Sequence, residues 1–116
     1  MTIKILHNPR CSKSRATLAL LEERGIEPEI VLYLQAPPTA DELRSILDKL
    51  GLSARALMRK GEAEYRELGL AERTLDEDEL IDIMVEHPRL IERPIVLANK
   101  QAAVGRPPES VLGILE

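Results

Sequence analysis

The stretch of sequence from Ile3 to Ser14 reads IKILHNPRCSKS, and it predicts a strand, a loop and the start of a helix. Residues 3–6 have the length and apolar character of a short buried strand. The Asn-Pro pair that follows disfavours helical backbone at Asn8, so the polar segment after the strand is predicted to be a loop. A helix is expected to begin at Ser12, which places Cys11 at the junction between loop and helix.

The segment that follows this helix in the sequence completes a predicted βαβ unit. The helix is expected to end at Gly25, in a C-cap position. Residues 29–32 are rich in β-branched side chains and predict a second strand. Strand, helix and strand together have the length of a βαβ unit. The apolar stripe expected along the helix consists of Ala16, Leu18, Ala19, Leu20 and Leu21.

The middle of the chain is predicted to be helical. Thr39 and Glu42 have the spacing of a capping box, and they open a helix that Gly51 closes. The other helices in this part are expected at residues 54–57, 62–68 and 76–86, the last one ending at His87-Pro88.

The last third of the chain predicts two strands and a helix. Short strands are expected at residues 94–97 and 102–104, joined by a hairpin turn at Asn99-Lys100. A closing helix is expected to start at Pro107-Pro108 and to run through Leu115.

The order of these elements predicts an α/β fold. It runs βαβ, then a helical insertion, then ββα, which resembles the thioredoxin-like fold with helices inserted in its middle. The chain has 116 residues, the size of one domain, so we expect a single domain over residues 1–116. Apolar residues make up 44% of the chain, and Tyr33 and Tyr65 are its two aromatic residues, so the core must be aliphatic.

Charge and composition argue against several classes of partner. The net charge of -4 leaves no excess positive charge to neutralise phosphates, which argues against nucleic-acid binding. The first residues do not have the long apolar stretch of a signal peptide, and no segment approaches the ~20 apolar residues that span a bilayer. A lone cysteine cannot form an internal disulfide, and it predicts a cytoplasmic location.

Cys11 is the first candidate for chemistry. A helix N-terminus presents unpaired N–H groups and a partial positive charge, which favour a thiolate over a thiol. Arg10, Lys13 and Arg15 flank Cys11 and add positive potential, and the sequence does not say which of them faces the sulfur. Ser14 completes a Cys-x-x-Ser motif, in which its hydroxyl can hydrogen-bond a thiolate or an oxyanion. The alternative for a lone cysteine is a small buried apolar side chain, but the polar, basic neighbours argue against it.

Arg59, Arg93 and Arg106 are candidate oxyanion ligands. Arg59 lies in a predicted turn between helices, and Arg93 and Arg106 lie at predicted strand ends next to prolines. Guanidinium groups bind tetrahedral oxyanions through paired N–H donors. The alternative for any one of them is a solvated surface charge.

The two histidines and an acidic run are weaker candidates. His7 lies four residues before Cys11, where it either orients the loop and tunes the thiolate or simply caps the strand end. His87 favours the C-terminus of its helix. The acidic run at residues 76–79 is interpreted as the first turn of a helix.

Four separated motifs together resemble the glutaredoxin-coupled arsenate reductase (ArsC) family, with agreement in spacing and order over essentially the whole chain. They are residues 7–15 (HNPRCSKSR), 57–62 (LMRKGE), 91–96 (IERPIV) and 104–109 (VGRPPE).

This resemblance implies a function and a set of roles. Cys11 would attack arsenate, and Arg59, Arg93 and Arg106 would hold the oxyanion and the arsenylated intermediate. Glutathione would act as co-substrate and form a mixed disulfide at Cys11, which glutaredoxin would reduce. Pro94 matches a proline that thioredoxin-like folds hold in cis. We expect a monomer without a bound cofactor or metal ion, and His7, Ser14 and Arg15 as supporting residues.

Three other readings are weighed against this one. Spx-type regulators that bind RNA polymerase share the fold, but their Cys-x-x-Cys switch is impossible with Ser14. Phosphatase-like arsenate reductases need Cys-x5-Arg and further cysteines, and position 17 is Thr17, so that class is excluded. A glutathione-dependent thiol reductase with another substrate would keep Cys11 without requiring arsenate, and the three arginines favour the oxyanion enzyme.

Overall fold

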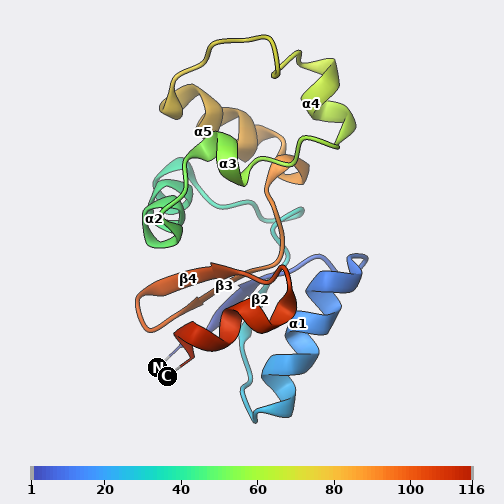
Figure 1. Cartoon of the computed structure of the whole chain (residues 1–116), viewed down its shortest axis with the longest axis vertical. Coiled ribbons are helices and arrows are strands. Elements are labelled where there is room, and N and C mark those ends of the chain that lie inside the picture. Colours follow the sequence, from blue (N-terminus) through green and yellow to red (C-terminus); the bar gives the residue numbers. More distant parts are fainter. Residues whose placement is uncertain (1, 116) are drawn as a thin grey trace. The chain divides into compact units, whose positions relative to one another are not determined.

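The central feature of the fold is a mixed sheet of four strands in the order β2-β1-β3-β4 (Figure 1). The computed structural model describes residues 2–115. β1 and β2 are parallel, whereas β3 is antiparallel to both β1 and β4. The predicted βαβ unit and the predicted hairpin are therefore both confirmed. The strands are β1 (Lys4–Leu6), β2 (Glu29–Val31), β3 (Ile95–Ala98) and β4 (Gln101–Val104).

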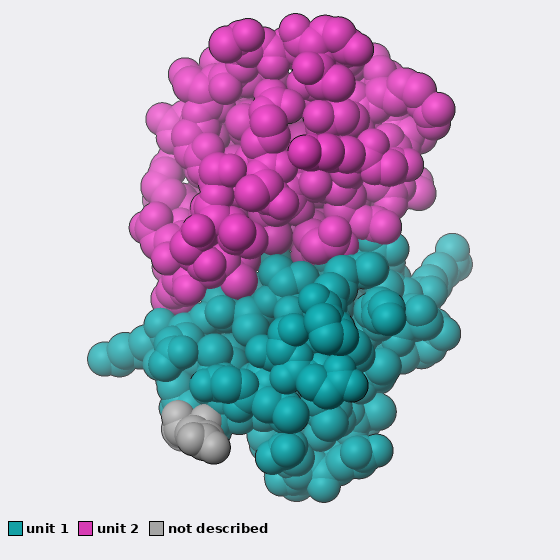
Figure 2. Space-filling view, viewed as in Figure 1, with its two compact units in different colours: residues 1–36, 93–116 teal, residues 37–92 magenta. Residues whose placement is uncertain are grey.

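The chain divides into two compact units, which Figure 2 distinguishes by colour. The first unit combines Met1–Ala36 with Arg93–Glu116 and contains the sheet. The second unit is Pro37–Glu92 and contains the predicted helical insertion.

The core of the first unit lies between the sheet and two helices. These are α1 (Ser12–Glu23), which connects β1 to β2, and the 3-10 helix η2 (Pro108–Ile114), which packs on α1 and β4. Burying aliphatic side chains between a sheet and the helices on it is the main stabilising contribution of such a layer. The core residues are Ile5, Leu21, Val96, Ala98, Val111 and Ile114.

The buried face of α1 differs from the predicted apolar stripe. Ser14, Thr17 and Leu21 are the buried residues of this helix, at a spacing that lines one helical face. Ala16 and Ala19, which were predicted to lie in the stripe, are exposed. The prediction is confirmed for Leu21, which is buried, and for Leu18 and Leu20, which pack against the core, and it was wrong for the two alanines. Ser14 and Thr17 take the other buried positions because their hydroxyl groups find hydrogen-bond partners there.

The second unit is a cluster of short helices. Thr39 caps α2 with both hydrogen bonds of a capping box, and Gly51 ends α2 in the left-handed conformation, as predicted. α5 packs against both α2 and α3, and its buried residues are Leu80, Ile81 and Met84. The elements are α2 (Ala40–Leu50), α3 (Ala54–Leu57), α4 (Ala63–Glu67), α5 (Glu77–Glu86) and the 3-10 helix η1 (Pro88–Leu90).

The last hairpin and the closing helix complete the first unit. Asn99 and Lys100 both have positive φ, 53° and 63°, as expected for a two-residue hairpin turn whose twist matches that of the strands. A closing helix was expected from Pro107-Pro108 through Leu115, and the structure has the 3-10 helix η2 there. Neither Pro107, which precedes η2, nor Pro108, its first residue, has an N–H donor, and Gly113 disfavours α-helix, so the tighter hydrogen-bonding pattern prevails. No helix within residues 2–115 is long and apolar enough to cross a membrane.

Candidate active site

The strand register brings three loops of the first unit to one edge of the sheet. Leu6, the last residue of β1, pairs with Ile95, which in turn pairs with Val104, the last residue of β4. The loop after β1, the segment before β3 and the segment after β4 therefore start from the same edge. The N–H of Gly105 donates to the carbonyl oxygen of Pro94 at 2.9 Å and extends the hairpin by one step.

Cys11 lies at this edge as the N-cap residue of α1. Its N–H donates to the carbonyl oxygen of Asn8 at 3.0 Å, and its carbonyl accepts from the N–H of Arg15 at 2.9 Å. The residue is 7% exposed and therefore nearly covered. The N-terminal end of α1 contributes a partial positive charge at the sulfur.

Arg106 is the basic residue whose guanidinium faces the sulfur of Cys11. Its Nη2 lies 3.5 Å from Sγ of Cys11, and its Nε donates to the carbonyl oxygen of Arg93 at 2.8 Å. The second contact orients the guanidinium, and the first places a permanent positive charge beside the sulfur. The structure thus answers a question that the sequence leaves open, because the residue at the sulfur is not one of the basic neighbours in the loop.

Arg93 and Pro94 lie beside Arg106 in the same unit. The Arg93-Pro94 peptide bond is cis, as the resemblance predicts for Pro94. The Arg106-Pro107 bond is also cis, which the sequence reasoning missed. The Nε and Nη1 atoms of Arg93 are buried. Two of the three candidate arginines are therefore at the Cys11 edge of the sheet.

His7 and Ser14 form a buried pair beneath the loop. Nδ1 of His7 lies 2.6 Å from Oγ of Ser14, and the N–H of Asn8 donates to the same oxygen at 3.0 Å. Burial lowers the pKa of His7 below its ordinary value, and the nearby charge of Arg15 lowers it further. Among residues 2–115, the Ser14 hydroxyl forms its hydrogen bonds with His7 and with the N–H of Asn8, so this serine connects the loop to α1.

The basic residues flanking Cys11 are exposed and have separate surroundings. Arg15 folds back and donates from Nη1 to the carbonyl oxygen of Pro9 at 2.9 Å, which braces the loop. Arg10 and Lys13 are exposed. The N–H of Arg10 donates to Oδ1 of Asn8 at 3.0 Å, a local turn that the Asn-Pro pair favours.

Arg59 belongs to the second unit, where it is part of a network of ion pairs. Its N–H donates to the carbonyl oxygen of Leu90 at 2.7 Å. Its Nη1 pairs with Glu62, and its Nε lies 3.4 Å from Glu92. Arg89 pairs with Glu62 as well, at 3.4 Å. The guanidinium of Arg59 is therefore oriented by two carboxylates.

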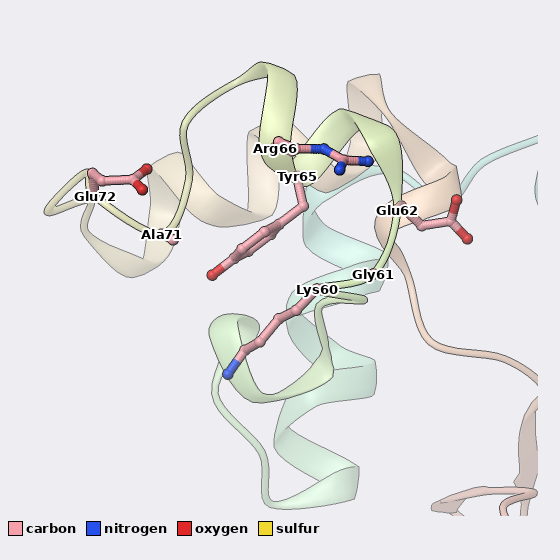
Figure 3. A pocket seen from close by; sticks show the side chains of 7 residues that line it. All are labelled: Lys60, Gly61, Glu62, Tyr65, Arg66, Ala71 and Glu72. Carbon is pink, nitrogen blue, oxygen red and sulfur yellow. The ribbon is translucent and has the colours of Figure 1, made fainter.

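A shallow pocket of about 330 Å³ lies in the second unit, around α4 (Figure 3). It contains none of the predicted site residues, although Glu62, the ion-pair partner of Arg59, is at its rim. Its lining residues are Lys60, Gly61, Glu62, Tyr65, Arg66, Ala71 and Glu72.

The acidic run at residues 76–79 lies at the N-terminus of α5 and includes its N-cap residue. Asp76 is the N-cap, and its Oδ1 accepts from the N–H of Glu79 at 2.8 Å. Glu77 accepts from the N–H of Ala54 at 2.7 Å, and Asp78 pairs with Arg44 at 2.7 Å. In the part of the chain that the structure describes, no group of three or more His, Cys, Asp or Glu side chains could hold a metal ion.

Comparison with protein families shows which family the chain is similar to. The model of the ArsC family matches residues 6–114. The arsenate reductase of Neisseria meningitidis serogroup A is 59% identical over 114 residues, 97% of both chains. The uncharacterised protein YfgD of Escherichia coli K12 is also 59% identical over 114 residues, 97% of this chain and 96% of its own.

Solved structures agree with the sequence comparisons. The arsenate reductase from Vibrio cholerae has a TM-score of 0.95 at 53% identity, covering 99% of this chain and 98% of its own. The expected thioredoxin-like fold with a helical insertion is thereby confirmed. The family match spans the Cys11 loop, all three candidate arginines and both units, and the chain belongs to the ArsC family.

Proposed function

We propose that this protein is an arsenate reductase in which the Cys11 thiolate attacks arsenate. The observation that carries the proposal is the guanidinium of Arg106, 3.5 Å from Sγ of Cys11 at the N-terminus of α1. The names of several relatives at 50–59% identity support arsenate as the substrate.

The charge of the site supports attack of one anion on another. A thiolate and arsenate, which is anionic at pH 7, repel each other unless positive charge surrounds both. The end of α1 and the guanidinium of Arg106 provide such charge at the sulfur. We assign Arg93 and Arg59 as further oxyanion ligands, because both stand in the family motifs and guanidinium N–H groups match the oxygens of a tetrahedral anion.

The proposed first step forms a sulfur–arsenic bond. A lone pair of the Cys11 sulfur attacks arsenic, and one arsenate oxygen leaves as water after protonation. Arsenic is still pentavalent at this point. Arg106, already beside the sulfur, then lies next to the new arsenyl group and its negative charge.

Glutathione and glutaredoxin are the proposed reductants. The sulfur of glutathione attacks the Cys11 sulfur, so an S–S bond forms and the electrons of the S–As bond stay on arsenic, which leaves as arsenite. The glutaredoxin thiolate attacks the glutathione sulfur of the mixed disulfide, which releases the Cys11 thiolate and leaves the glutathione on glutaredoxin. A second glutathione then frees glutaredoxin and leaves as glutathione disulfide. Two thiols thus supply the two electrons. We place this reaction in the cytoplasm, where thiols are kept reduced.

The experiment that tests the proposal measures arsenate-dependent NADPH oxidation with glutathione, glutathione reductase and glutaredoxin. The wild-type protein is expected to turn over, and Cys11→Ser to be inactive while still folded. A folded wild-type protein without turnover, in an assay where a known arsenate reductase works, contradicts the proposal. Reduction of glutathione mixed disulfides without arsenate turnover would instead favour a thiol reductase with another substrate.

A further inference from the structure

Gly105 occupies a position with no space for a side chain. A Cβ placed there would lie 2.5 Å from Oγ1 and 3.1 Å from Cγ2 of Thr17, and 2.8 Å from Cγ of Pro94. Carbon atoms do not pack at such distances, so a neighbour would have to move. Gly105 has no positive φ, unlike Gly25, which has open space around it. A close approach, rather than backbone conformation, therefore requires glycine at position 105.

The group that approaches Gly105 is a buried threonine on α1. Thr17 is fully buried, and its Oγ1 donates to the carbonyl oxygen of Lys13 at 2.8 Å. The same oxygen lies 3.5 Å from the carbonyl oxygen of Gly105. This hydrogen bond to the preceding turn fixes the rotamer of Thr17, so its two branches present a defined surface to the backbone at Gly105.

Each of the two residues in this contact lies close in the chain to Cys11 or Arg106. Gly105 precedes Arg106, whose Nη2 lies 3.5 Å from Sγ of Cys11. Thr17 lies on the helix that Cys11 caps. Gly105 is also tied to the start of β3, because its N–H donates to Pro94. Thr17 on α1 and Gly105 after β4 are in contact. How closely these two segments approach each other therefore limits how closely Arg106 approaches the sulfur.

We propose that Gly105 is a positioning residue: because it has no side chain, the segment that carries Arg106 can lie against Thr17 and hold the guanidinium of Arg106 close to the Cys11 sulfur. This inference deepens the proposed function and rests on it for its catalytic meaning. The geometric part is independent of arsenate, because it concerns a contact between a cation and a thiolate within one unit. A side chain at position 105 would push the segment that carries Arg106 away from α1 and weaken the positive potential at the sulfur.

The test compares alkylation of Cys11 by iodoacetate, an anion, with alkylation by iodoacetamide, which is neutral. The ratio of the two rates reports the positive charge near the sulfur and cancels changes in accessibility that affect both reagents. Gly105→Ala is expected to lower this ratio by roughly threefold or more. Gly113→Ala is the matched control, because a Cβ at Gly113 meets nothing within 4 Å, and its ratio should equal that of the wild type.

A second substitution makes the test specific to this contact. Thr17→Ala removes both atoms of Thr17 that a Cβ at position 105 would meet. The double variant Thr17→Ala with Gly105→Ala should therefore regain part of the wild-type ratio, because the contact with Cγ of Pro94 at 2.8 Å remains, whereas Thr17→Ala alone should change the ratio little. Because Thr17 and Gly105 are in contact, their effects on stability are coupled as well, so the readout is the ratio of alkylation rates in folded protein rather than the free energy of unfolding.

The outcomes separate this inference from the proposed function. A folded Gly105→Ala protein with an unchanged ratio overturns the inference, as does a double variant that stays as low as Gly105→Ala. If Gly105→Ala alone does not fold, the double variant decides, and a ratio reduced by about threefold or more in that variant overturns the inference. None of these measurements uses arsenate, so they give the same answer whether or not the protein reduces it. With arsenate, Gly105→Ala should raise KM, and the double variant should lower it again.

Discussion

The Nη2 atom of Arg106 lies 3.5 Å from the Sγ atom of Cys11, although 95 positions separate the two residues in the sequence. The contact exists because β4 ends at the same edge of the sheet as β1, through the pairing of both strands with β3. It places a guanidinium group beside the sulfur that is proposed to react.

Removing this cation is expected to impair arsenate reduction strongly. Arg106→Gln keeps hydrogen-bonding capacity but loses the charge, so kcat/KM for arsenate should fall by about 100-fold, the scale of losing one preorganised donor at a developing charge. The control is Arg24→Gln, an exposed arginine at the C-terminal end of α1, which should leave kcat/KM unchanged. Equal activity of the two variants would show that Arg106 does not act at the sulfur.

The buried His7 predicts a loss of stability in mild acid. Burial, and then the charge of Arg15, lower the pKa of His7 in the folded protein below its ordinary value of 6.5. The unfolded chain therefore binds a proton at His7 more readily, and the free energy of unfolding falls as the pH drops below 6.5 towards the folded-state pKa. Above pH 6.5 this contribution to stability is fully present.

The measurement is urea unfolding at pH 7.5 and pH 5.5 for the wild type and for His7→Asn. Asparagine keeps a polar group near the position of Nδ1 but does not titrate. The wild type should lose more stability than the variant between the two pH values, since the carboxylates contribute equally to both proteins. An equal loss in the two proteins would contradict the assignment to His7.

The cap of α5 predicts a stability effect in the second unit. Asp76 accepts a hydrogen bond from the N–H of Glu79 at 2.8 Å, so Asp76→Ala leaves that donor without its partner. The loss should be about 1 kcal/mol in the free energy of unfolding, measured with urea. Asp76→Asn, which keeps the accepting oxygen, should lose clearly less. If both variants lost the same free energy of unfolding, the stabilisation would come from the charge of Asp76 rather than from its capping hydrogen bond.

Two paired isoleucines on neighbouring strands predict losses of stability of different size. Ile5 on β1 is fully buried, whereas Ile30, its register partner on β2, is 47% exposed. Ile5→Ala should cost about 2–5 kcal/mol of the free energy of unfolding through lost burial and a cavity. Ile30→Ala should cost well under half of that, because much of its side chain is already in water. Chemical denaturation of both variants checks this, and similar losses would show that the edge strand β2 is covered in solution.

Features that depend on neighbours along the chain were predictable. Thr39 and Asp76 cap their helices because an N-cap side chain reaches the N–H groups of the next turn, whatever surrounds the helix. The turn at Asn99-Lys100 follows from the positive φ that a two-residue hairpin needs. Several helix and strand ends differ by one residue from the predicted ends, which is the usual uncertainty in where such elements end.

The burial of α1 was not predictable from its apolar residues. Ser14 and Thr17 face the core because His7 and the carbonyl oxygens of Lys13 and Gly105 satisfy their hydroxyl groups. Those partners come partly from segments distant in the sequence, so a pattern of apolar residues could not reveal them. In the sequence, Gly105 is one residue of the motif at 104–109, and the absence of space for a Cβ at this position is a property of the packed structure.

The sequence by itself singled out the candidates for chemistry: a lone cysteine before a helix, and three arginines in three of the four motifs that resemble the ArsC family. Local hydrogen bonding and residue type settle such features, because they act over a few positions of the chain. Only the tertiary structure decided that Arg106, and none of the adjacent basic residues, faces the Cys11 sulfur. Strand register and the close approach of Thr17 to Gly105 set that distance, since both join segments that the sequence keeps far apart.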